Sequence, residues 1–580
     1  MCGIVGYTGH ESCMEKLLAG LTVLEYRGYD SAGVALLGEE LSVLRAEGKL
    51  IALKRKAVGW DDGEMTGIGH TRWATHGSPD KKNAHPHTDP EGQVAVVHNG
   101  IIENYRTLKE ELTREGAVFS SETDTEVIPH LLARARRAGR NPIEAIWDTV
   151  GRLTGSFALG ILFADRPNRV YGVRRGSPLI VAEGKGGTHM ASDILALQGV
   201  ARGVYPVGED EIAVLTPREV IFFDRFGVVR QRVASPLQTE KQTVGRGRYA
   251  TFMEKEMAEF PRAVEATATA PAPPFSRRAE TVYLVGCGSA YHAGMVGELL
   301  FERTSHTPAR AVVASEFRYR EIPLGPRTPV IFLSQSGETA DTLASLRLAK
   351  EKGAPTYAVV NVPTSAIARE ADGVYLTQAG PEVAVATTKA YGAQVAALCR
   401  LALGVPKKAV LTKVVKACEA ALSLPLEGVV PYLTPRAHAY YIGRDMDDAI
   451  CREGCLKLKE ISYLHAESYA AGELKHGTIS LIDRGTPVIA VATQEGVYGK
   501  TLANVEEVLA RGAEVWLLAD GEFAVPTHPH LHRIALPHVE REYAALPAAV
   551  VLERIALGVA KARGYDPDKP RNLAKSVTVE

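Results

Sequence analysis

The second residue of the chain, Cys2, carries a side chain that can attack a carbonyl carbon. Once Met1 is removed, this residue holds both a thiol and a free α-amine. The reference pKa values of the two groups are close, about 8 for the amine and about 8.5 for the thiol, so the amine can accept the thiol proton near neutral pH. A nucleophile and its base on one residue favour covalent catalysis, although Cys2 alone is also compatible with a cysteine that merely packs.

Three short motifs supply groups that such a nucleophile needs. Arg72, in the motif His70–Gly77, offers a guanidinium that suits a carboxylate. Asn99 and Gly100 follow an apolar run and offer an amide and a backbone N–H, which are oxyanion donors. Asp124 stands just before an expected helix, where it could cap the helix or bind an ammonium. Together these groups predict a site for an α-amino acid with a cleavable side-chain acyl group.

A second set of polar residues follows apolar runs in the C-terminal half. Ser334–Thr339 comes directly after one expected strand, and Gly286–Ala290 ends another. Loops at the carboxyl ends of parallel strands converge on the ligand crevice of this architecture, and hydroxyls with backbone N–H groups at a helix start bind anions. A phosphate monoester is the expected ligand, with an ordinary polar turn as the alternative. The G-x-G-x-x-G pattern of dinucleotide sites fails at Tyr291.

Glu453, Lys457 and Glu460 fall on one face of an expected helix, apart from its apolar stripe. Such a spacing is also typical of a solvated surface ion pair. The C-terminal tail, residues 572–580, holds Lys575 among small and β-branched residues, which is unusual for a frayed terminus. His85 and His87 could bind a metal, but only Asp89 lies close in sequence, so a loop is the better interpretation. We expect no metal and no organic cofactor.

The elements that position these groups must belong to several domains, because the chain has 580 residues with 46% hydrophobic and 23% charged side chains. This length suggests about three to five domains. The net charge of −1 argues against a nucleic-acid partner. We expect no stretch apolar and long enough to span a membrane, and no membrane partner. Seven cysteines are too few for a disulfide framework, which favours a cytoplasmic location.

The first 220 residues read as β-like runs with a few helices, and the last 300 as a repeated βαβ pattern. Helices are predicted over residues 101–115 and 125–138, and an α+β layered domain follows from this mixture. Residues 221–279 read as a linker. Beyond it, Tyr283, Thr328 and Gly353 begin segments that are echoed 157, 158 and 159 residues later. We therefore predict two tandem copies of one doubly wound parallel-sheet domain, at 280–425 and 426–570.

The N-terminal motifs resemble the glutaminase domain of N-terminal-nucleophile glutamine amidotransferases. These motifs run from Cys2-Gly-Ile-Val-Gly and Tyr26–Ser31 to Ser121–Thr125. The resemblance implies a glutaminase domain at 2–220, in which Cys2 attacks the glutamine amide and Asn99 and Gly100 stabilise the oxyanion. The implied glutamine-binding residues are Arg72, Trp73, Thr75, His76 and Asp124.

The C-terminal loops resemble sugar-isomerase (SIS) phosphosugar-binding domains, and motifs over the whole chain resemble the family of isomerizing glutamine–fructose-6-phosphate aminotransferases. This implies transfer of the glutamine amide nitrogen to fructose 6-phosphate, giving glucosamine 6-phosphate and glutamate. Lys575 would form a Schiff base with the ketone, and Glu460 would move a proton between C1 and C2. His476 from a neighbouring subunit would open the sugar ring, which implies a homodimer. Lys457 and Glu453 would support the proton transfer, and the sugar phosphate would be bound by Ser289, Ser334, Gln335, Ser336 and Thr339.

The chain departs from the family pattern at Ala290, where a hydroxyl residue is more usual, and in the acidic stretch from Gly443 to Cys451. Ala290 keeps open a related amidotransferase or deaminase that acts on another ketose phosphate. A regulatory phosphosugar-binding protein without catalysis is a second alternative, against which Cys2, Glu460 and Lys575 argue.

Overall fold

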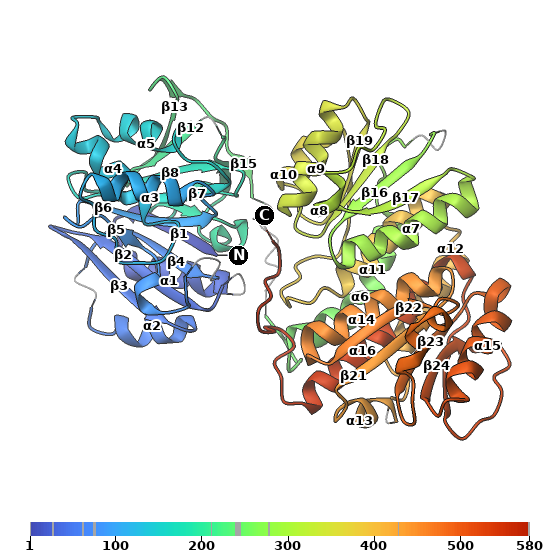
Figure 1. The fold of residues 1–580 in the computed structure, drawn as a ribbon. Coiled ribbons are helices and arrows are strands. Elements are labelled where there is room, and N and C mark those ends of the chain that lie inside the picture. Colours follow the sequence, from blue (N-terminus) through green and yellow to red (C-terminus); the bar gives the residue numbers. More distant parts are fainter. Residues whose placement is uncertain are drawn as a thin grey trace. The chain divides into compact units, whose positions relative to one another are not determined.

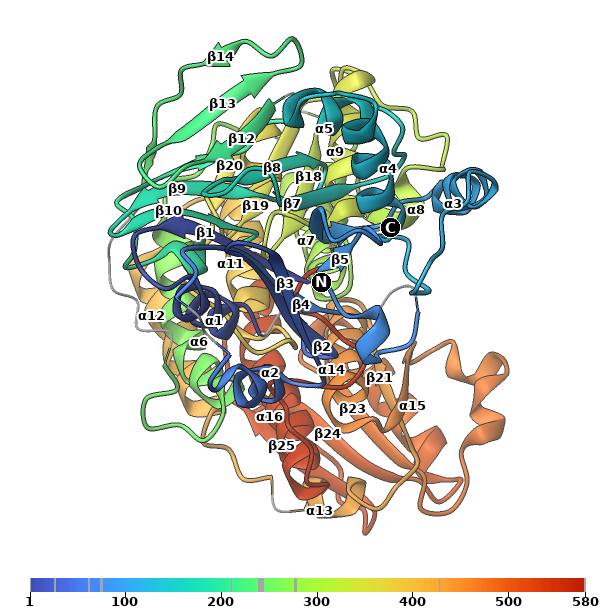
Figure 2. The same ribbon diagram turned by 90° about the vertical axis from the view of Figure 1, so that its left-hand side faces the viewer.

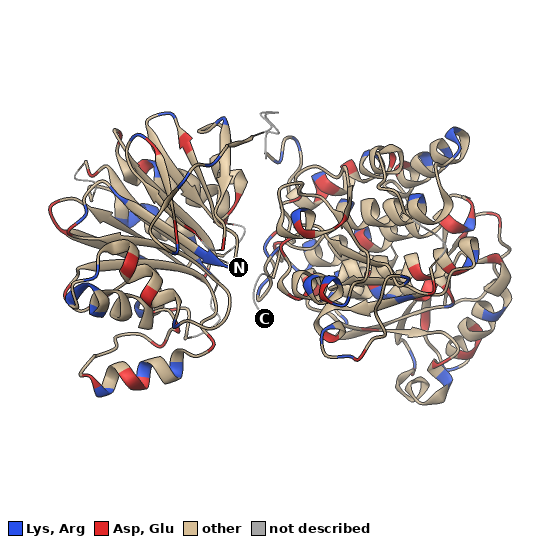
Figure 3. Cartoon of the chain, turned by 90° about the horizontal axis from the view of Figure 1, so that it is seen from above, with Lys and Arg blue, Asp and Glu red and all other residues tan. Residues whose placement is uncertain are grey.

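The computed structural model describes residues 2–25, 28–60, 63–73, 77–209, 211–237, 245–275, 279–426 and 428–577. The chain divides into two compact units, residues 1–243 with 576–580 and residues 244–575. In both units basic and acidic residues are interspersed (Figure 3).

Unit 1 contains two antiparallel sheets. One has the strand order β15-β11-β9-β10-β1-β4-β2-β3 and the other β14-β13-β12-β8-β7-β6-β5 (Figure 2). The strands are β1 (Gly3–Gly9), β2 (Ser31–Leu37), β3 (Leu41–Glu47), β4 (Thr66–Arg72), β5 (His87–Thr88), β6 (Val94–Gly100), β7 (Phe157–Phe163), β8 (Val170–Arg175), β9 (Ile180–Gly184), β10 (Gly187–Ala191), β11 (Gly203–Pro206), β12 (Glu211–Leu215), β13 (Val220–Asp224), β14 (Val229–Arg230) and β15 (Ser235–Pro236). The helices are α1 (Cys13–Leu24), α2 (Leu50–Ala57), α3 (Tyr105–Arg114), α4 (Val127–Arg137) and α5 (Pro142–Val150).

The two sheets pack face to face and helices cover their outer faces, so the predicted α+β layered fold is confirmed (Figure 1). Alternate side chains such as Ile4 of β1 and Val97 of β6 fill the space between the sheets. The apolar faces of α1 and α2 pack on the first sheet, and those of α4 and α5 on the second. This arrangement brings the ends of β1, β4 and β6 together.

Two boundaries in this unit differ from the sequence expectation. The helix expected over residues 101–115 begins at Tyr105, because the N–H groups of Ile101 and Ile102 donate to Ser156 O and to Asp124 Oδ2 instead of entering a helix. The unit also extends past residue 220, since β13 pairs with β12 and β15 pairs with β11.

Unit 2 contains two parallel sheets with matching orders, β17-β16-β18-β19-β20 and β22-β21-β23-β24-β25, which confirms the predicted repeat of a parallel-sheet fold. The strands are β16 (Val282–Gly286), β17 (Ala309–Val313), β18 (Val330–Ser334), β19 (Thr356–Val360), β20 (Gly373–Leu376), β21 (His438–Gly443), β22 (His465–Ala470), β23 (Pro487–Ala492), β24 (Glu514–Asp520) and β25 (Leu531–Leu536). The helices are α6 (Phe252–Thr269), α7 (Ser289–Ser305), α8 (Ala314–Phe317), α9 (Ala340–Glu351), α10 (Ala366–Glu370), α11 (Lys389–Leu403), α12 (Lys408–Ala421), α13 (Val429–Leu433), α14 (Met446–Ser462), α15 (Tyr498–Leu509) and α16 (Ala545–Ala562).

A shared core joins the two copies. Helices α6, α7, α11, α14 and α16 lie between the sheets, while α9 and α15 cover the outer faces (Figure 1). Helix α6 falls within the expected linker, but its buried residues Met253, Met257 and Phe260 make it part of this core.

The helical stretch Arg541–Ala562, which includes α16, is long and apolar enough to cross a membrane by length and composition. The expectation that no stretch of the chain reaches this length was therefore wrong. In the described structure 89% of an 18-residue segment within that stretch is buried inside the protein, since α16 packs against α14 within the shared core.

Candidate active sites

The predicted nucleophile Cys2 lies at the start of β1, beside the end of β4. Its Sγ accepts a hydrogen bond from Trp73 N at 3.2 Å, and the thiol lies 3.6 Å from Trp73 O. Trp73 also contacts Tyr29 edge to face, with the ring centroids 5.7 Å apart. Burial raises the pKa of the Cys2 thiol above its ordinary value. Formation of a thiolate therefore depends on a base close to Sγ.

The predicted oxyanion donors stand next to this nucleophile. Asn99, at the end of β6, is buried and donates from Nδ2 to Cys2 O at 2.9 Å. Gly100 has a φ of +129°, and a Cβ there would lie 2.0 Å from Ser156 O, so the position requires glycine. The structure therefore places the Asn99 amide at Cys2, with Gly100 next to it in the chain, and the oxyanion role of the two residues stays a prediction.

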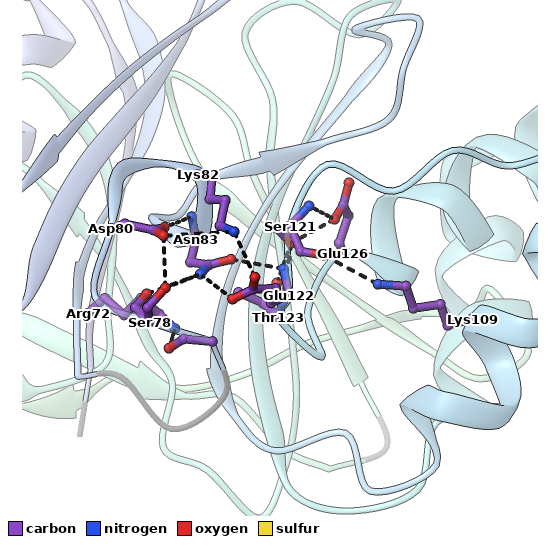
Figure 4. A network of polar contacts seen from close by, with 11 residues as sticks. Arg72, Ser78, Asp80, Lys82, Asn83, Lys109, Ser121, Glu122, Thr123 and Glu126 are labelled. Carbon is purple, nitrogen blue, oxygen red and sulfur yellow. Dashed lines mark hydrogen bonds and ion pairs between the residues drawn. The ribbon is translucent and has the colours of Figure 1, made fainter.

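The predicted glutamine-binding residues are connected through loops. Arg72 donates to Ser78 O and Gly77 O, both at 3.1 Å. Asn83 donates from Nδ2 to Ser78 O, and its Oδ1 accepts from Glu122 N (Figure 4). The Arg72 loop is thereby fixed to the segment that holds Asp124.

Asp124 is buried, and its Oδ2 accepts the Ile102 N–H at 2.7 Å. It does not cap α4, so the capping alternative is not realised and the ammonium-binding role stays a prediction. Thr75 and His76, which were predicted to bind glutamine, lie outside the described residues.

In unit 2 the predicted phosphate loop joins β18 to α9. The Ser334 and Thr339 hydroxyls lie 2.9 Å apart, and Ser334 Oγ accepts the Gly337 N–H at 3.0 Å. Ser336 Oγ accepts the Glu338 N–H, and Thr339 precedes the first residue of α9. Gln335, between Ser334 and Ser336, is partly exposed. The loop therefore collects hydroxyls at the start of a twelve-residue helix, which is an arrangement suited to an anion.

The predicted catalytic face of α14 is buried rather than solvated. Lys457 Nζ lies 3.4 Å from Glu453 Oε1 and 2.6 Å from Glu460 Oε2, and the side chains of Lys457 and Glu453 are each 1% exposed. Although burial alone would lower it, the two carboxylates raise the pKa of Lys457. The alternative of a surface ion pair is thereby excluded. The more exposed Glu460 remains the carboxylate that a ligand can reach.

Glu453 is held from the first copy. Ser289 Oγ donates to its Oε1 at 2.7 Å, and His292 Nδ1 lies 2.8 Å from its Oε2. Burial alone would raise the pKa of Glu453, but Lys457 and the two donors lower it. The Ser289 hydroxyl, which was predicted to contact the sugar, donates to this carboxylate. Sequence reasoning missed His292, although its position one helical turn after Ser289 would have placed both on the same face.

Lys575 forms an ion pair with Glu382, and the side chains are 5% and 0% exposed. Glu382 also accepts the N–H groups of Thr388 and Ala390 at the start of α11. Burial would raise its pKa, but Lys575 lowers it. Sequence reasoning missed Glu382 because a single Glu among apolar residues in a loop gives no periodic signal.

The tail that carries Lys575 is anchored by Asp568, whose carboxylate accepts the N–H groups of Phe252 and Met253 at the start of α6. Glu553 of α16 is buried, and burial raises the pKa of its carboxyl well above the ordinary value.

The predicted ring-opening residue, His476, is exposed on the short turn Leu474–His476 after β22. The described residues contain no group of three His, Cys, Asp or Glu side chains arranged to hold a metal ion. His85 and His87 pack as a buried pair with ring centroids 4.8 Å apart.

Comparison with protein families and known proteins places these sites in context. A glutamine amidotransferase domain model matches residues 70–199, and a SIS domain model matches residues 277–403 and 432–550. A glutamine–fructose-6-phosphate aminotransferase [isomerizing] of Aquifex aeolicus is 44% identical over 595 residues, and one of Symbiobacterium thermophilum is 45% identical over 612 residues. Both alignments cover all of this chain and all of the relative.

A solved structure agrees with this result for the C-terminal half. The C-terminal domain of glucosamine-fructose-6-phosphate aminotransferase from Francisella tularensis is 32% identical, with a TM-score of 0.51, and covers 57% of this chain and 100% of that one. A tagatose-6-phosphate ketose/aldose isomerase from Escherichia coli, 18% identical with a TM-score of 0.50, shares the fold over 56% of this chain and 96% of its own. From the full-length relatives we conclude that the chain belongs to the family of isomerizing glutamine–fructose-6-phosphate aminotransferases.

Proposed function

We propose that this chain transfers the amide nitrogen of glutamine to fructose 6-phosphate and isomerises the product to glucosamine 6-phosphate, with release of glutamate. One observation carries the proposal. A terminal thiol with oxyanion donors and a buried Glu–Lys–Glu cluster with an ion-paired lysine occur in one chain. The relatives that match over its full length carry the name of that aminotransferase.

In the glutaminase reaction, the α-amine of Cys2 takes the thiol proton and the thiolate attacks the side-chain carbonyl carbon of glutamine. Asn99 Nδ2 and the Gly100 N–H stabilise the oxyanion that forms. Arg72 binds the substrate carboxylate and Asp124 its ammonium, with Thr75, His76 and Trp73 completing the pocket. The carbon–nitrogen bond then breaks, the leaving nitrogen receives the proton held on the α-amine, and water hydrolyses the thioester to glutamate.

In the sugar reaction, the hydroxyls of Ser334, Ser336 and Thr339 bind the phosphate together with Gln335. Lys575 leaves Glu382, loses its proton and forms an imine with C2 of the open-chain ketose, with loss of water. Ammonia displaces the lysine from this imine. It must arrive unprotonated, because ammonium is not a nucleophile.

Glu460 completes the isomerisation by removing a proton from C1 and returning one to C2, which converts the imine of a ketose into an amino aldose. Lys457 stays between Glu453 and Glu460, with its Nζ 2.6 Å from Glu460 Oε2. We also propose that the chain acts in the cytoplasm as a homodimer, in which the exposed His476 of one subunit opens the sugar ring bound by the other.

Borohydride trapping tests the lysine. Incubation with fructose 6-phosphate and borohydride should reduce the imine and attach one hexitol phosphate to Lys575, as read by peptide mass spectrometry. Lys561, which is half-exposed and pairs with Glu254, provides the matched control and should carry no adduct. A wild-type enzyme that forms glucosamine 6-phosphate without any adduct on Lys575 would refute the imine.

A second experiment separates the substrates. Steady-state rates with several ketose phosphates should be highest for fructose 6-phosphate, and a higher kcat/KM for another ketose phosphate would favour the related amidotransferase. Cys2→Ala should lose glutamine-dependent synthesis but retain isomerisation of the sugar, because the two sites use different residues.

A further inference from the structure

Four buried histidines of unit 1 take no part in the proposed reaction. His70 lies in β4 and His98 in β6. His87 lies in β5, and His85 lies just before that strand. The rings of His70 and His85 are stacked, with centroids 4.2 Å apart and planes at 11°. Buried polar side chains are usually hydrogen-bonded, and a satisfied buried network fixes the orientation of the groups that it contacts.

The hydrogen bonds of His70 establish where its proton lies. Its Nε2 is 2.9 Å from His98 O and 3.1 Å from Asn99 Oδ1. A backbone carbonyl can only accept, so Nε2 must carry the hydrogen. Burial lowers the pKa of His70 to about 3, so the ring is neutral at pH 7, with the proton on Nε2 and none on Nδ1.

This proton determines which way the Asn99 amide points. Because Nε2–H is a donor, the amide atom that faces it must be the oxygen, and the Asn99 NH2 group then points away from the histidine. That group donates to Cys2 O at 2.9 Å. The opposite rotamer would place the NH2 group against Nε2–H and turn Oδ1 toward Cys2 O, which separates a donor from its acceptor at a buried site and costs on the order of 1–3 kcal/mol.

We infer that His70 is a positioning residue for the oxyanion site: its Nε2–H holds the Asn99 amide so that Nδ2 faces the nucleophilic residue. This inference rests on the proposed glutaminase reaction and extends it. The other contacts of the cluster have different targets, since His87 Nε2 contacts the Thr123 hydroxyl and His85 Nδ1 accepts the His98 N–H.

Three variants test the inference with glutaminase kinetics. His70→Met replaces the imidazole with an apolar side chain of similar length and removes the donor. This variant should lower kcat about 10–100-fold, with KM for glutamine changed less than about 3-fold. His70→Gln restores an N–H near the Nε2 position and should recover most of kcat. His87→Met removes an equally buried imidazole that does not contact Asn99, and should change kcat less than about 3-fold.

A double-mutant cycle shows whether His70 acts through Asn99. If it does, His70→Met combined with Asn99→Ala should lose no more activity than Asn99→Ala alone. Losses that multiply would overturn the inference. The rate of Cys2 alkylation by iodoacetamide, a displacement without an oxyanion, should be the same in His70→Met and wild type. Slower alkylation by more than about 3-fold would assign the defect to the nucleophile and would also overturn it.

One measurement needs no folded variant. In wild-type protein labelled with ¹⁵N-histidine, the ring nitrogens of His70 should report the Nε2–H tautomer throughout pH 6–8. An Nδ1–H tautomer would overturn the inference whatever the variants do. The proposed function fails separately, if wild-type protein hydrolyses no glutamine at all.

Discussion

The two copies of the parallel-sheet fold differ in the loop that follows the strands β18 and β23. In the first copy the loop after β18 presents the hydroxyls of Ser334 and Thr339. The residues at the same places after β23, 158 positions later, are Ala492 and Val497. The second loop is instead closed from within, because Asp447 Oδ2 accepts the N–H of Thr493 at 2.8 Å and of Gln494 at 3.3 Å. Asp447 stands 157 positions after Ala290, which has no acceptor to offer.

The helix that follows the first strand of each copy shows the reverse difference. Helices α7 and α14 are in register at a spacing of 157 residues. Glu453, Lys457 and Glu460 of α14 correspond to positions 296, 300 and 303 of α7, which carry Val, Leu and Arg. The hydroxyl-bearing loop after β18 and the charged face of α14 therefore lie in different copies, and the loop after β23 is bonded by Asp447 of α14. In the proposed reaction, binding of the phosphate and transfer of the proton therefore fall to different copies.

The largest effect is expected from removing the chemistry of the second copy. Glu460→Gln should lower glucosamine 6-phosphate formation about 10²–10⁴-fold, because an amide cannot carry the proton between C1 and C2. Glutamine hydrolysis should persist, as measured by glutamate release. Glu302→Gln, on the exposed face of α7, is the matched control and should stay within about 2-fold of wild type. If Glu460→Gln forms glucosamine 6-phosphate at the wild-type rate, Glu460 of α14 does not transfer the proton.

A smaller effect is expected when the first loop is given the residues of the second. Ser334→Ala with Thr339→Val removes two hydroxyls that hydrogen-bond to each other, and should raise KM for fructose 6-phosphate about 10–100-fold, which corresponds to about 1.4–2.8 kcal/mol for the pair together. The value of kcat should change less than about 3-fold. The reverse pair, Ala492→Ser with Val497→Thr, should leave KM unchanged. If both pairs change KM alike, the two loops do not differ in function.

The support that the first copy gives to the second can be tested at His292. His292→Phe removes the group beside Glu453 Oε2 and should lower kcat for synthesis about 10-fold with KM for fructose 6-phosphate nearly constant. Tyr291→Phe, at the adjacent position of α7, should have little effect. A large change in KM with constant kcat would mean that His292 binds substrate rather than supporting Glu453.

The smallest effect is expected from the carboxylate that closes the second loop. Burial raises the pKa of Asp447 from 3.8 to about 6, despite the hydrogen bonds from Thr493 and Gln494. The stability that accompanies this shift is fully present below about pH 4 and is lost as pH rises through 6. Asp447→Asn does not titrate, so the melting temperature of wild type should fall relative to the variant between pH 4.5 and 6.5. The corresponding change is at most about 3 kcal/mol. Parallel melting curves over this range would show that Asp447 is not perturbed.

The amino-acid sequence predicts much of this division because strands buried on both faces and loops rich in hydroxyls are local patterns. The strand β16 and the loop Ser334–Thr339 fall where the sequence places them. The contacts of Ser289, His292 and Glu382 join residues more than 150 positions apart, and no local pattern shows such pairs. The N–H groups of Ile101 and Ile102 likewise have partners distant in sequence, which is why periodicity placed the start of α3 too early.

One chain takes nitrogen from glutamine and delivers it to the sugar. Wild-type enzyme supplied with glutamine labelled with ¹⁵N at the amide, together with fructose 6-phosphate, should form glucosamine 6-phosphate that carries ¹⁵N and one glutamate for each amino sugar. Two results would contradict this transfer. One is release of glutamate without any labelled amino sugar, and the other is isomerisation of the sugar, with or without glutamine, and no amino sugar formed.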